Sequence, residues 1–334
     1  MSDTVRIGVV GLGRLGRRHA ENLAFRVEGA HLVAAASPIA EERDWAEKAL
    51  NGAATYPGLP ELIDHPGLDA VWLVTPTSLH ADQVIASIRA GKHVFCEKPL
   101  ALDPADCDRA IAVAAERPSQ IVMVGFMRRF DPAYAEAKRR IEAGELGEVF
   151  AIRCLSEDPA DPSGFFVRFA PTSGGSFLDC SIHDIDLVRW MLGGARASSV
   201  SAVGSRLMYP ALAGCGDVDT ASAVVAFEGG GIADFHVSRT SHRGYEAAMT
   251  IAGSKATLEI GRAIPRLPLT LQTDGRRSAA GQVDFFERFG DAFLHEARAF
   301  VEAVRRGGPT PLSLEDAREA TRLACAMREA LRVG

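Results

Sequence analysis

The sequence has no segment typical of export or of membrane insertion. Its amino-terminus, MSDTVRIGVVGLG, lacks the basic stretch and the long apolar stretch that mark a signal peptide. No window of about 18 residues is without charged or turn-forming residues, so we expect no transmembrane helix and no membrane partner. Internal repeats, low-complexity segments and long blocks of like charge are also absent. These absences favour a globular cytoplasmic protein.

Cysteines are few and lie far apart, and none forms a CxxC pair. The six are Cys96, Cys107, Cys154, Cys180, Cys215 and Cys325. This spacing fits reduced thiols in a cytoplasmic protein, and it argues against a disulfide framework or a zinc site. No cluster of histidine and cysteine suggests a metal, so we expect none. The formal net charge of -6 argues against nucleic acid as the main partner.

The length of 334 residues exceeds what one compact domain usually holds, so we expect two domains. Residues 1–125 alternate short apolar stretches with helical patterns. We expect strands at 5–10, 31–36, 69–75, 93–98 and 120–126, and helices at 14–25, 40–50, 78–90 and 103–117. Near-continuous apolar strands separated by helices indicate an α/β fold, a Rossmann-type doubly wound parallel sheet covered on both faces.

The rest of the chain, residues 126–334, has a different rhythm. We expect helices at 131–144, 174–194, 285–306 and 313–331, a loop at 159–173, and strands at 148–156, 198–207, 219–228, 231–240, 246–252 and 256–260. Successive strands joined by short turns, such as EGGG at 228–231, indicate antiparallel pairing. We therefore expect a carboxyl-terminal α+β domain, built on an open and mostly antiparallel sheet, for substrate binding and oligomerisation.

The first strand and helix are joined by a glycine-rich loop. Gly11, Gly13 and Gly16 have the GxGxxG spacing between a strand and a helix, the context that a dinucleotide site requires. Gly11 permits the tight turn, Gly13 lets a pyrophosphate approach, and Gly16 lets the helix pack closely. The main-chain N–H groups at the helix start, at Arg14 and Leu15, would face the phosphates. The alternative is a glycine-rich turn that binds nothing.

The choice between NAD and NADP depends on the end of the second strand. NAD sites usually have an acidic residue there, about 20 positions after the glycine loop, and this sequence has Ser37 and Pro38 instead. Ser37 could bind a 2′-hydroxyl or a 2′-phosphate. Arg43 could reach a phosphate, but Glu41 and Glu42 stand closer and would repel it. We expect NAD, with NADP as the alternative.

Three further stretches carry a family resemblance. They are EKPLAL at 97–102, GFMRRFDPAYAEAKRRIEAGELG at 125–147, and GGSFLDCSIHDIDLVRWMLG at 174–193. Together with the glycine loop they resemble the Gfo/Idh/MocA oxidoreductases, and the second stretch looks like the inositol 2-dehydrogenase branch. The resemblance covers nearly the whole chain, in order. Its most specific part is EKP followed about 80 residues later by D-x-x-x-H.

The resemblance implies a function and a set of residues. The family's catalytic lysine, aspartate and histidine match Lys98, Asp179 and His183. It implies that a ring carbinol of a polyol or sugar is oxidised to a ketone, with hydride passing to NAD or NADP. It also implies that the open-sheet domain forms homo-oligomers, most often tetramers, with dimers as the alternative.

These residue types suit that chemistry. Histidine has the right intrinsic pKa to accept a hydroxyl proton near neutrality, so His183 is the candidate base. Asp179 and His183 are four apart and would share one face of a helix. Lys98 follows a strand, where ligands bind in open α/β sheets, and its cation could stabilise a developing alkoxide. A cis bond between Lys98 and Pro99 would direct the lysine sharply, and we keep this as a hypothesis.

The stretch around Asp179 also has a plain alternative. Asp179 could cap the helix, while His183, Asp184 and Asp186 form a solvated face. Lys98 and the glycine loop make this alternative weaker for Asp179 and His183. Asp184 could orient the base, and we expect Asp186 to be structural.

Other residues are candidates of lower rank. The expected cofactor contacts beyond the glycine loop and Ser37 are Thr75, Pro76, His80, Glu97 and Lys98. The expected substrate contacts, besides the catalytic residues, are Arg128, Asp158, His236 and Tyr245, with Arg239 as a further candidate. Surface, turn or sheet-face roles are the alternatives for these five. We expect His19 to be structural, and Asp217 and Asp219 to be turn residues.

The sequence leaves several functions open. We expect a cytoplasmic NAD-dependent dehydrogenase for a cyclitol or sugar, with myo-inositol, scyllo-inositol and L-glucose as candidate substrates. The SEDPADPSGFF loop differs from what an ordinary myo-inositol enzyme leads us to expect. The alternatives are a sugar sensor without turnover and a hydrolase that recycles its NAD internally.

Overall fold

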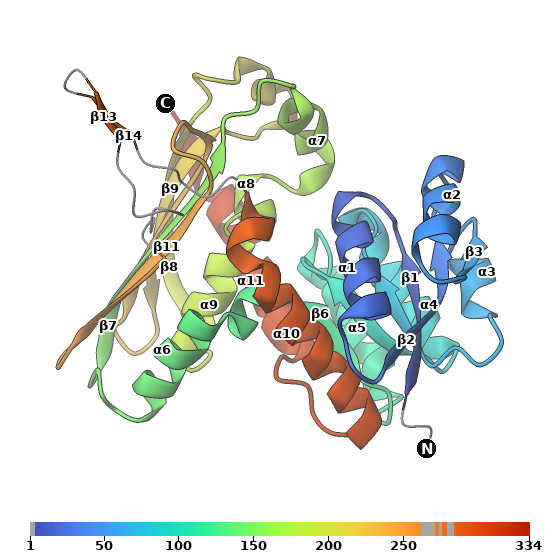
Figure 1. Cartoon of the computed structure of the whole chain (residues 1–334). Coiled ribbons are helices and arrows are strands. Elements are labelled where there is room, and N and C mark those ends of the chain that lie inside the picture. The colour runs from blue at the N-terminus through green and yellow to red at the C-terminus, as the bar shows by residue number, and fades with distance from the viewer. Residues whose placement is uncertain (1–3, 262–270, 274–275, 279–283) are drawn as a thin grey trace. The chain divides into compact units, whose positions relative to one another are not determined.

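The computed structural model describes residues 4–261, 271–273, 276–278 and 284–334. The chain divides into two compact units (Figure 1). The first unit comprises Met1–Phe130 and Asp291–Thr321, and the second comprises Asp131–Gly290 and Arg322–Gly334.

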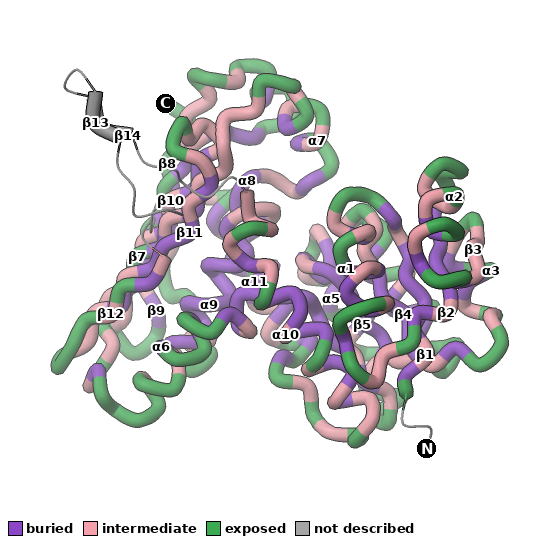
Figure 2. Tube along the Cα trace, viewed as in Figure 1, coloured by how far each residue is buried: buried purple, intermediate pink, exposed green. Residues whose placement is uncertain are grey.

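The first unit contains a six-stranded parallel sheet with the order β3-β2-β1-β4-β5-β6. Its strands are β1 (Val5–Val10), β2 (Ala30–Ala36), β3 (Ala54–Tyr56), β4 (Ala70–Leu73), β5 (His93–Glu97) and β6 (Val122–Gly125). Every residue of β4 is buried, whereas β3 at the sheet edge is only partly buried (Figure 2). The strand order, with helices between successive parallel strands, confirms the doubly wound fold. The short β3 was not expected.

Helices separate these strands. They are α1 (Arg14–Phe25), α2 (Ala40–Ala49), α3 (Leu59–Ile63), α4 (His80–Arg89) and α5 (Pro104–Ala115), with short 3₁₀ turns η1 (Thr77–Leu79) and η2 (Met127–Phe130). Local sequence explains their starts. At α5, the Asp103 carboxylate accepts a hydrogen bond from the Ala105 N–H, and Pro104 occupies the first helical position.

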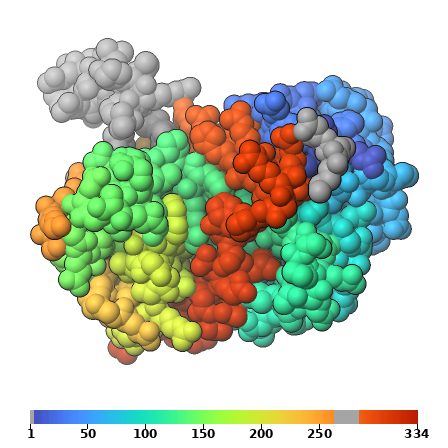
Figure 3. Space-filling view, turned by 90° about the horizontal axis from the view of Figure 1, so that it is seen from below, coloured from blue at the N-terminus to red at the C-terminus, as the bar shows by residue number. Residues whose placement is uncertain are grey.

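The first unit also includes a late segment of the chain. The sequence predicted that the first domain would end at residue 125. The first unit also contains residues 291–321, because the apolar face of α10 (Phe285–Arg306) completes its core. Phe300 and Leu294 pack in one cluster with Trp72 and Phe95. Figure 3 shows the orange and red atoms of this late segment beside the blue and teal atoms of the first unit. The division falls just after a kink in α10 at Phe289.

The second unit contains a seven-stranded sheet with the order β12-β11-β7-β10-β9-β8-β15. Its strands are β7 (Val149–Pro159), β8 (Ala197–Ser205), β9 (Thr220–Phe227), β10 (Ile232–Ser241), β11 (Glu246–Gly253), β12 (Thr257–Ile260) and β15 (Leu331–Val333). Pairs β10–β7 and β15–β8 are parallel and the others antiparallel. This confirms an open, mostly antiparallel sheet. A separate two-stranded ladder joins β13 (Leu271–Thr273) and β14 (Arg276–Ser278).

Helices lie beside one face of this sheet (Figure 1). They are α6 (Pro132–Glu142), α8 (Ser176–Asp179) and α9 (Ile182–Met191). The unit also contains α7 (Phe165–Ser173) and η3 (Pro210–Cys215), and α11 (Leu314–Glu329) belongs to the first unit up to Thr321 and to the second from Arg322. Strand β10 shows the alternation that follows. Ala233, Phe235 and Val237 are buried, whereas Ile232 and His236 point to the other face and are partly exposed.

Two expectations for the second unit were wrong. The expected loop at 159–173 contains helix α7, which Phe166 and Ala170 support by packing on Leu212. The expected single helix at 174–194 is interrupted at residues 180–181, so α8 and α9 are separate. Tertiary packing and these local turns override the continuous apolar pattern that predicted one helix.

Two compositional expectations concern the whole chain. All six cysteines are thiols in the structure. Within the residues that the structure describes, no helix is both long and apolar enough to cross a membrane.

Candidate active site

The glycine loop has the shape that the sequence predicted. Gly11 has a φ of +95°, and a Cβ there would lie 2.4 Å from the Val74 carbonyl oxygen. A Cβ on Gly16 would lie 1.9 Å from the Gly11 carbonyl oxygen, so α1 approaches the loop too closely for any side chain. A Cβ on Gly13 would meet nothing within 4 Å. No side chain caps α1, which starts at Arg14. This open side and uncapped helix end fit a pyrophosphate.

The end of β2 carries an acidic group, supplied by one of the two glutamates that the sequence placed near Ser37. The Ser37 hydroxyl donates to the Glu42 carboxylate at 2.5 Å, because the start of α2 folds back over the strand end. The Ser37 hydroxyl also accepts the Ile39 N–H at 3.1 Å. Arg43 donates to the Ser37 carbonyl at 2.7 Å, so its guanidinium is held by the main chain. A carboxylate here suits the ribose hydroxyls of NAD and repels a 2′-phosphate.

The end of β4 leads into the expected nicotinamide region. The Thr75 hydroxyl donates to the Gln83 side-chain oxygen at 2.6 Å, and Pro76 is exposed. His80 is buried, and its two ring nitrogens lie 2.8 Å from the carbonyl oxygens of Thr75 and Pro99. Burial lowers the pKa of His80, and the contacts with these two carbonyls oppose that effect. The His80 ring is therefore occupied by the main chain, not exposed toward a ligand.

The end of β5 carries the lysine of the EKP motif. Lys98 is half-buried, and its main-chain N–H donates a hydrogen bond to the Glu97 carboxylate at 3.0 Å. Glu97 is buried, and its second carboxylate oxygen lies 2.8 Å from the ring of His19. The bond between Lys98 and Pro99 is cis, as hypothesised. Both Glu97 oxygens are thus turned inward.

The second unit gathers a separate charged cluster. Arg239 on β10 pairs with Asp179 at the end of α8, and its guanidinium lies 3.7 Å from the Asp158 carboxylate. The guanidinium also stacks over the Phe166 ring at 4.1 Å. Burial alone would lower the pKa of Arg239, but Cys180, Asp179 and Asp158 outweigh it and raise that pKa above its ordinary value. The structure thus joins two candidates, Asp158 and Asp179, through Arg239.

The acidic stretch after Asp179 is not a solvated face. His183, Asp184 and Asp186 are 8%, 1% and 2% exposed, so the alternative of a solvated face was wrong for them. The Ser156 hydroxyl donates to the Asp184 carboxylate at 2.6 Å and fixes it on β7. Between Asp179 and His183 the main chain keeps right-handed helical angles, although the two residues belong to different helices.

The remaining substrate candidates lie in different surroundings. Arg128 is buried in η2, which removes the surface role that was its alternative. Tyr245 is buried, with its ring centroid 6.3 Å from those of Phe285 and Phe289. His236 bonds Ser222 at 2.9 Å on the sheet face opposite that of Val237. Since Arg239 shares the face of Val237, strand alternation separates His236 from the Asp179 cluster.

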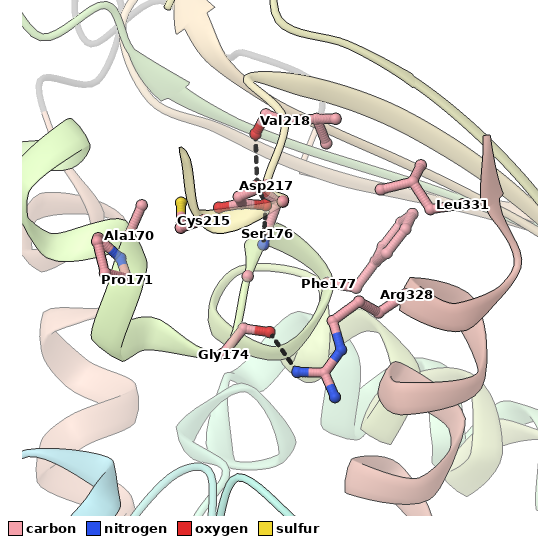
Figure 4. A pocket seen from close by; sticks show the side chains of 12 residues that line it. Ala170, Pro171, Gly174, Ser176, Phe177, Cys215, Asp217, Val218, Arg328 and Leu331 are labelled. Carbon is pink, nitrogen blue, oxygen red and sulfur yellow. Dashed lines mark hydrogen bonds between the residues drawn. The ribbon is translucent and has the colours of Figure 1, made fainter. Parts of the chain in front are cut away.

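A small pocket of about 130 Å³ lies at the start of α8 (Figure 4). Gly174, Ser176 and Arg328 line it, together with Asp217, whose carboxylate accepts hydrogen bonds from the Ser176 N–H at 2.9 Å and from its hydroxyl at 3.0 Å. None of the substrate candidates lines this pocket. The hydrogen bonds from Ser176 to Asp217 anchor the start of the short helix that carries Asp179.

Both parts of the chain match models of one protein family. Residues 5–126 match the model described as an oxidoreductase family with an NAD-binding Rossmann fold, and residues 134–259 match the GFO/IDH/MocA C-terminal domain. Two similar proteins align over more than nine tenths of the chain at 39% and 37% identity. The chain belongs to the Gfo/Idh/MocA family of oxidoreductases. The resemblance drawn from the EKP and D-x-x-x-H motifs is confirmed.

Several relatives of this family member are inositol dehydrogenases. The chain is 39% identical to the scyllo-inositol 2-dehydrogenase (NAD(+)) of Bacillus subtilis, over 93% of this chain and 89% of that protein. It is 37% identical to the myo-inositol 2-dehydrogenase of Thermotoga maritima, over 98% and 96% of the two chains. The crystal structure of scyllo-inositol dehydrogenase from Lactobacillus casei with bound NAD(H) and scyllo-inositol aligns with a TM-score of 0.93, 37% identity and coverage of 98% and 97%.

Sequence reasoning missed one buried group in the first unit. His19, Glu97 and Glu296 place ligand-capable atoms within 4.8 Å of one another, and all three residues are buried. Burial, and then the nearby Glu97 charge, raise the pKa of Glu296 well above its ordinary value. His19 was expected only to be structural. Glu296 gave no local signal, because it stands in an otherwise amphipathic helix far along the chain.

Proposed function

We propose that this protein is an NAD-dependent dehydrogenase that oxidises a ring hydroxyl of a cyclitol, of the scyllo- or myo-inositol type, to a ketone. One observation carries the proposal. A chain that aligns almost end to end with inositol dehydrogenases retains Lys98, Asp179 and His183 at the motif positions of the family. A sensor without turnover would not need all three.

The first unit supplies the residues that would hold NAD. The loop of Gly11 and Gly13 and the main chain at Arg14 and Leu15 would hold the pyrophosphate, in keeping with the open side of Gly13. Ser37 with Glu42 would bind the adenosine ribose. Thr75, Pro76 and the main chain of Glu97 and Lys98 would line the nicotinamide end. Bound NAD supplies the hydride acceptor.

The catalytic roles follow from residue chemistry. His183 accepts the proton of the substrate hydroxyl. The Lys98 cation stabilises the negative charge that develops on that oxygen. Asp179, which Arg239 faces as a counter-charge, orients the substrate hydroxyl or the His183 ring.

Substrate recognition and assembly complete the proposal. Asp158, next to Arg239, and Arg128 would bind the other ring hydroxyls. The second unit's sheet has Val203, Val224 and Ile232 exposed on the face opposite its buried side chains. Exposed apolar side chains on an open sheet face support a homo-oligomer, and family resemblance favours a tetramer. Six thiols and no disulfide fit a cytoplasmic protein.

A substrate panel tests this function. Reduced-nicotinamide absorbance is followed with NAD or NADP and each of myo-inositol, scyllo-inositol, D-chiro-inositol, D-glucose and L-glucose. We expect reduction of NAD with an inositol, and its loss in Lys98→Ala and His183→Ala. Binding of NAD without reduction by any of the five would contradict the proposal, and it would favour the sensor or the NAD-recycling hydrolase.

A further inference from the structure

The segment from Glu97 to Pro99 is held on both sides by buried histidines. From α1, the His19 ring nitrogen Nε2 lies 2.8 Å from the Glu97 carboxylate. From α4, the His80 ring nitrogen Nδ1 lies 2.8 Å from the Pro99 carbonyl. His19 and His80 are each 1% exposed. Lys98 stands between these two contacts.

The His19 ring has little freedom to move. Its centroid lies 5.3 Å from that of Trp72, 5.8 Å from Phe95 and 5.4 Å from Phe293. Its other nitrogen, Nδ1, is buried without a hydrogen-bond partner in the part of the chain that the structure describes. Because a carboxylate only accepts, Nε2 carries the hydrogen and donates it to Glu97.

Glu97 passes this constraint to the lysine. One carboxylate oxygen accepts from His19, and the other accepts the Lys98 N–H at 3.0 Å. Gly125 is the partner of Glu97 in the β5–β6 ladder, and a Cβ on Gly125 would lie 3.2 Å from the Glu97 carboxyl group. The missing side chain at Gly125 therefore leaves the space in which the carboxylate sits.

The spacing of His19 and Glu97 is that of a hydrogen bond. The 2.8 Å between the His19 ring nitrogen and the Glu97 carboxylate oxygen lies in the ordinary range for a nitrogen donor and an oxygen acceptor. The third member, Glu296, is fully buried, and neither of its oxygens has a hydrogen-bond partner among the described residues. Burial, and then the nearby Glu97 carboxylate, raise the pKa of Glu296.

We propose that His19 and His80 are positioning residues for Lys98: His19 fixes the Glu97 carboxylate that holds the Lys98 N–H, and His80 fixes the Pro99 carbonyl. The His80 ring also contacts the Thr75 carbonyl, so it ties the end of β4 to the segment after β5. Neither histidine touches substrate. The catalytic part of this inference rests on the proposed function, in which Lys98 acts on the substrate oxygen.

The chain offers a direct probe, because it contains only five lysines: Lys48, Lys92, Lys98, Lys138 and Lys255. Reductive methylation with ¹³C gives few lysine signals in NMR, and Lys98→Arg identifies that of Lys98. His19→Phe keeps an aromatic ring among its neighbours but removes the donor. His19→Gln keeps a donor near the Nε2 position. The contact of His80 is made by Nδ1, so its pair of variants is His80→Leu, which removes the donor, and His80→Asn, which keeps one near the Nδ1 position.

We expect the Lys98 signal to shift or broaden in His19→Phe and His80→Leu, with the signals of Lys48, Lys138 and Lys255 unchanged. His19→Gln and His80→Asn should restore the wild-type signal. His93→Gln is the matched control, because His93 is a histidine at the other end of β5 that accepts the Ile121 N–H. A Lys98 signal that stays unchanged in the folded Phe and Leu variants would overturn the proposal.

Kinetics add a second readout. His19→Phe should lower kcat by about tenfold to a hundredfold, the size expected when a reacting group is misplaced by about 1 Å, with the Kd for NAD unchanged. His19→Gln should stay within about threefold of the wild type by the same reasoning. A purely structural histidine would lower the melting temperature without moving kcat or the Lys98 signal, and that result would refute positioning. Failure of every polyol would refute the proposed function and leave the NMR test standing.

Discussion

Glu296 is a buried carboxyl group whose protonation affects the stability of the fold. Its side chain is fully buried on α10, near Glu97 and His19. Burial and the Glu97 charge raise its pKa well above the ordinary 4.5. In the folded protein Glu296 keeps its proton at pH values where the unfolded chain has already released it.

The sign of the effect on stability follows from proton linkage. Above the unfolded pKa, unfolding releases the Glu296 proton, so the free energy of unfolding falls as pH rises, until the folded pKa is reached. The slope is at most about 1.4 kcal/mol per pH unit for one proton. Glu296→Gln is neutral at every pH and removes this slope. We expect the variant to gain about 1 kcal/mol over wild type between about pH 5 and pH 6.

The assay is urea unfolding of the full chain at a series of pH values, for wild type and Glu296→Gln. Glu302→Gln is the matched control, because Glu302 lies on the same helix but is partly exposed beside Arg306. The control should keep the wild-type pH slope. A Glu296→Gln variant that is less stable than wild type with an unchanged slope would show that Glu296 is ionised in the folded state, and it would refute this reasoning.

Three further predictions concern Glu42, Arg239 and Cys215. Glu42→Gln removes the carboxylate beside Ser37 and should raise kcat/KM for NADP relative to NAD by about tenfold, or ~1.4 kcal/mol; an unchanged ratio in steady-state assays would exclude Glu42 from cofactor choice. Arg239→Leu leaves Asp179 without its counter-charge and should lower the free energy of unfolding by about 3 kcal/mol, together with kcat; denaturant unfolding as stable as wild type would contradict this. The exposed Cys215 should react first with an aromatic disulfide reagent, and a fast phase that persists in Cys215→Ser would count against it.

The parts of the fold and site that sequence predicted have local causes. The glycine loop depends on Gly11, Gly13 and Gly16, whose roles are set by the strand and helix on either side of them. The doubly wound sheet follows from apolar strands alternating with helices. The position of Lys98 after β5 follows from the same rhythm.

The parts that sequence did not predict depend on contacts between distant segments. Helix α7 is supported by Leu212, which lies well beyond it in the chain. Glu296 approaches Glu97 because the apolar face of α10 returns to the first unit. No spacing rule within one element could reveal these pairs.

The reaction that we propose is net oxidation of a cyclitol with transfer of hydride to NAD. The most direct measurement follows scyllo-inositol and myo-inositol with NAD, and quantifies both the reduced nicotinamide and, by mass spectrometry, a product that has lost two hydrogens. We expect the two products in equal amounts, and neither in Lys98→Ala or His183→Ala. Polyol binding with NAD present, but with no ketone and no reduced nicotinamide, would contradict the claim.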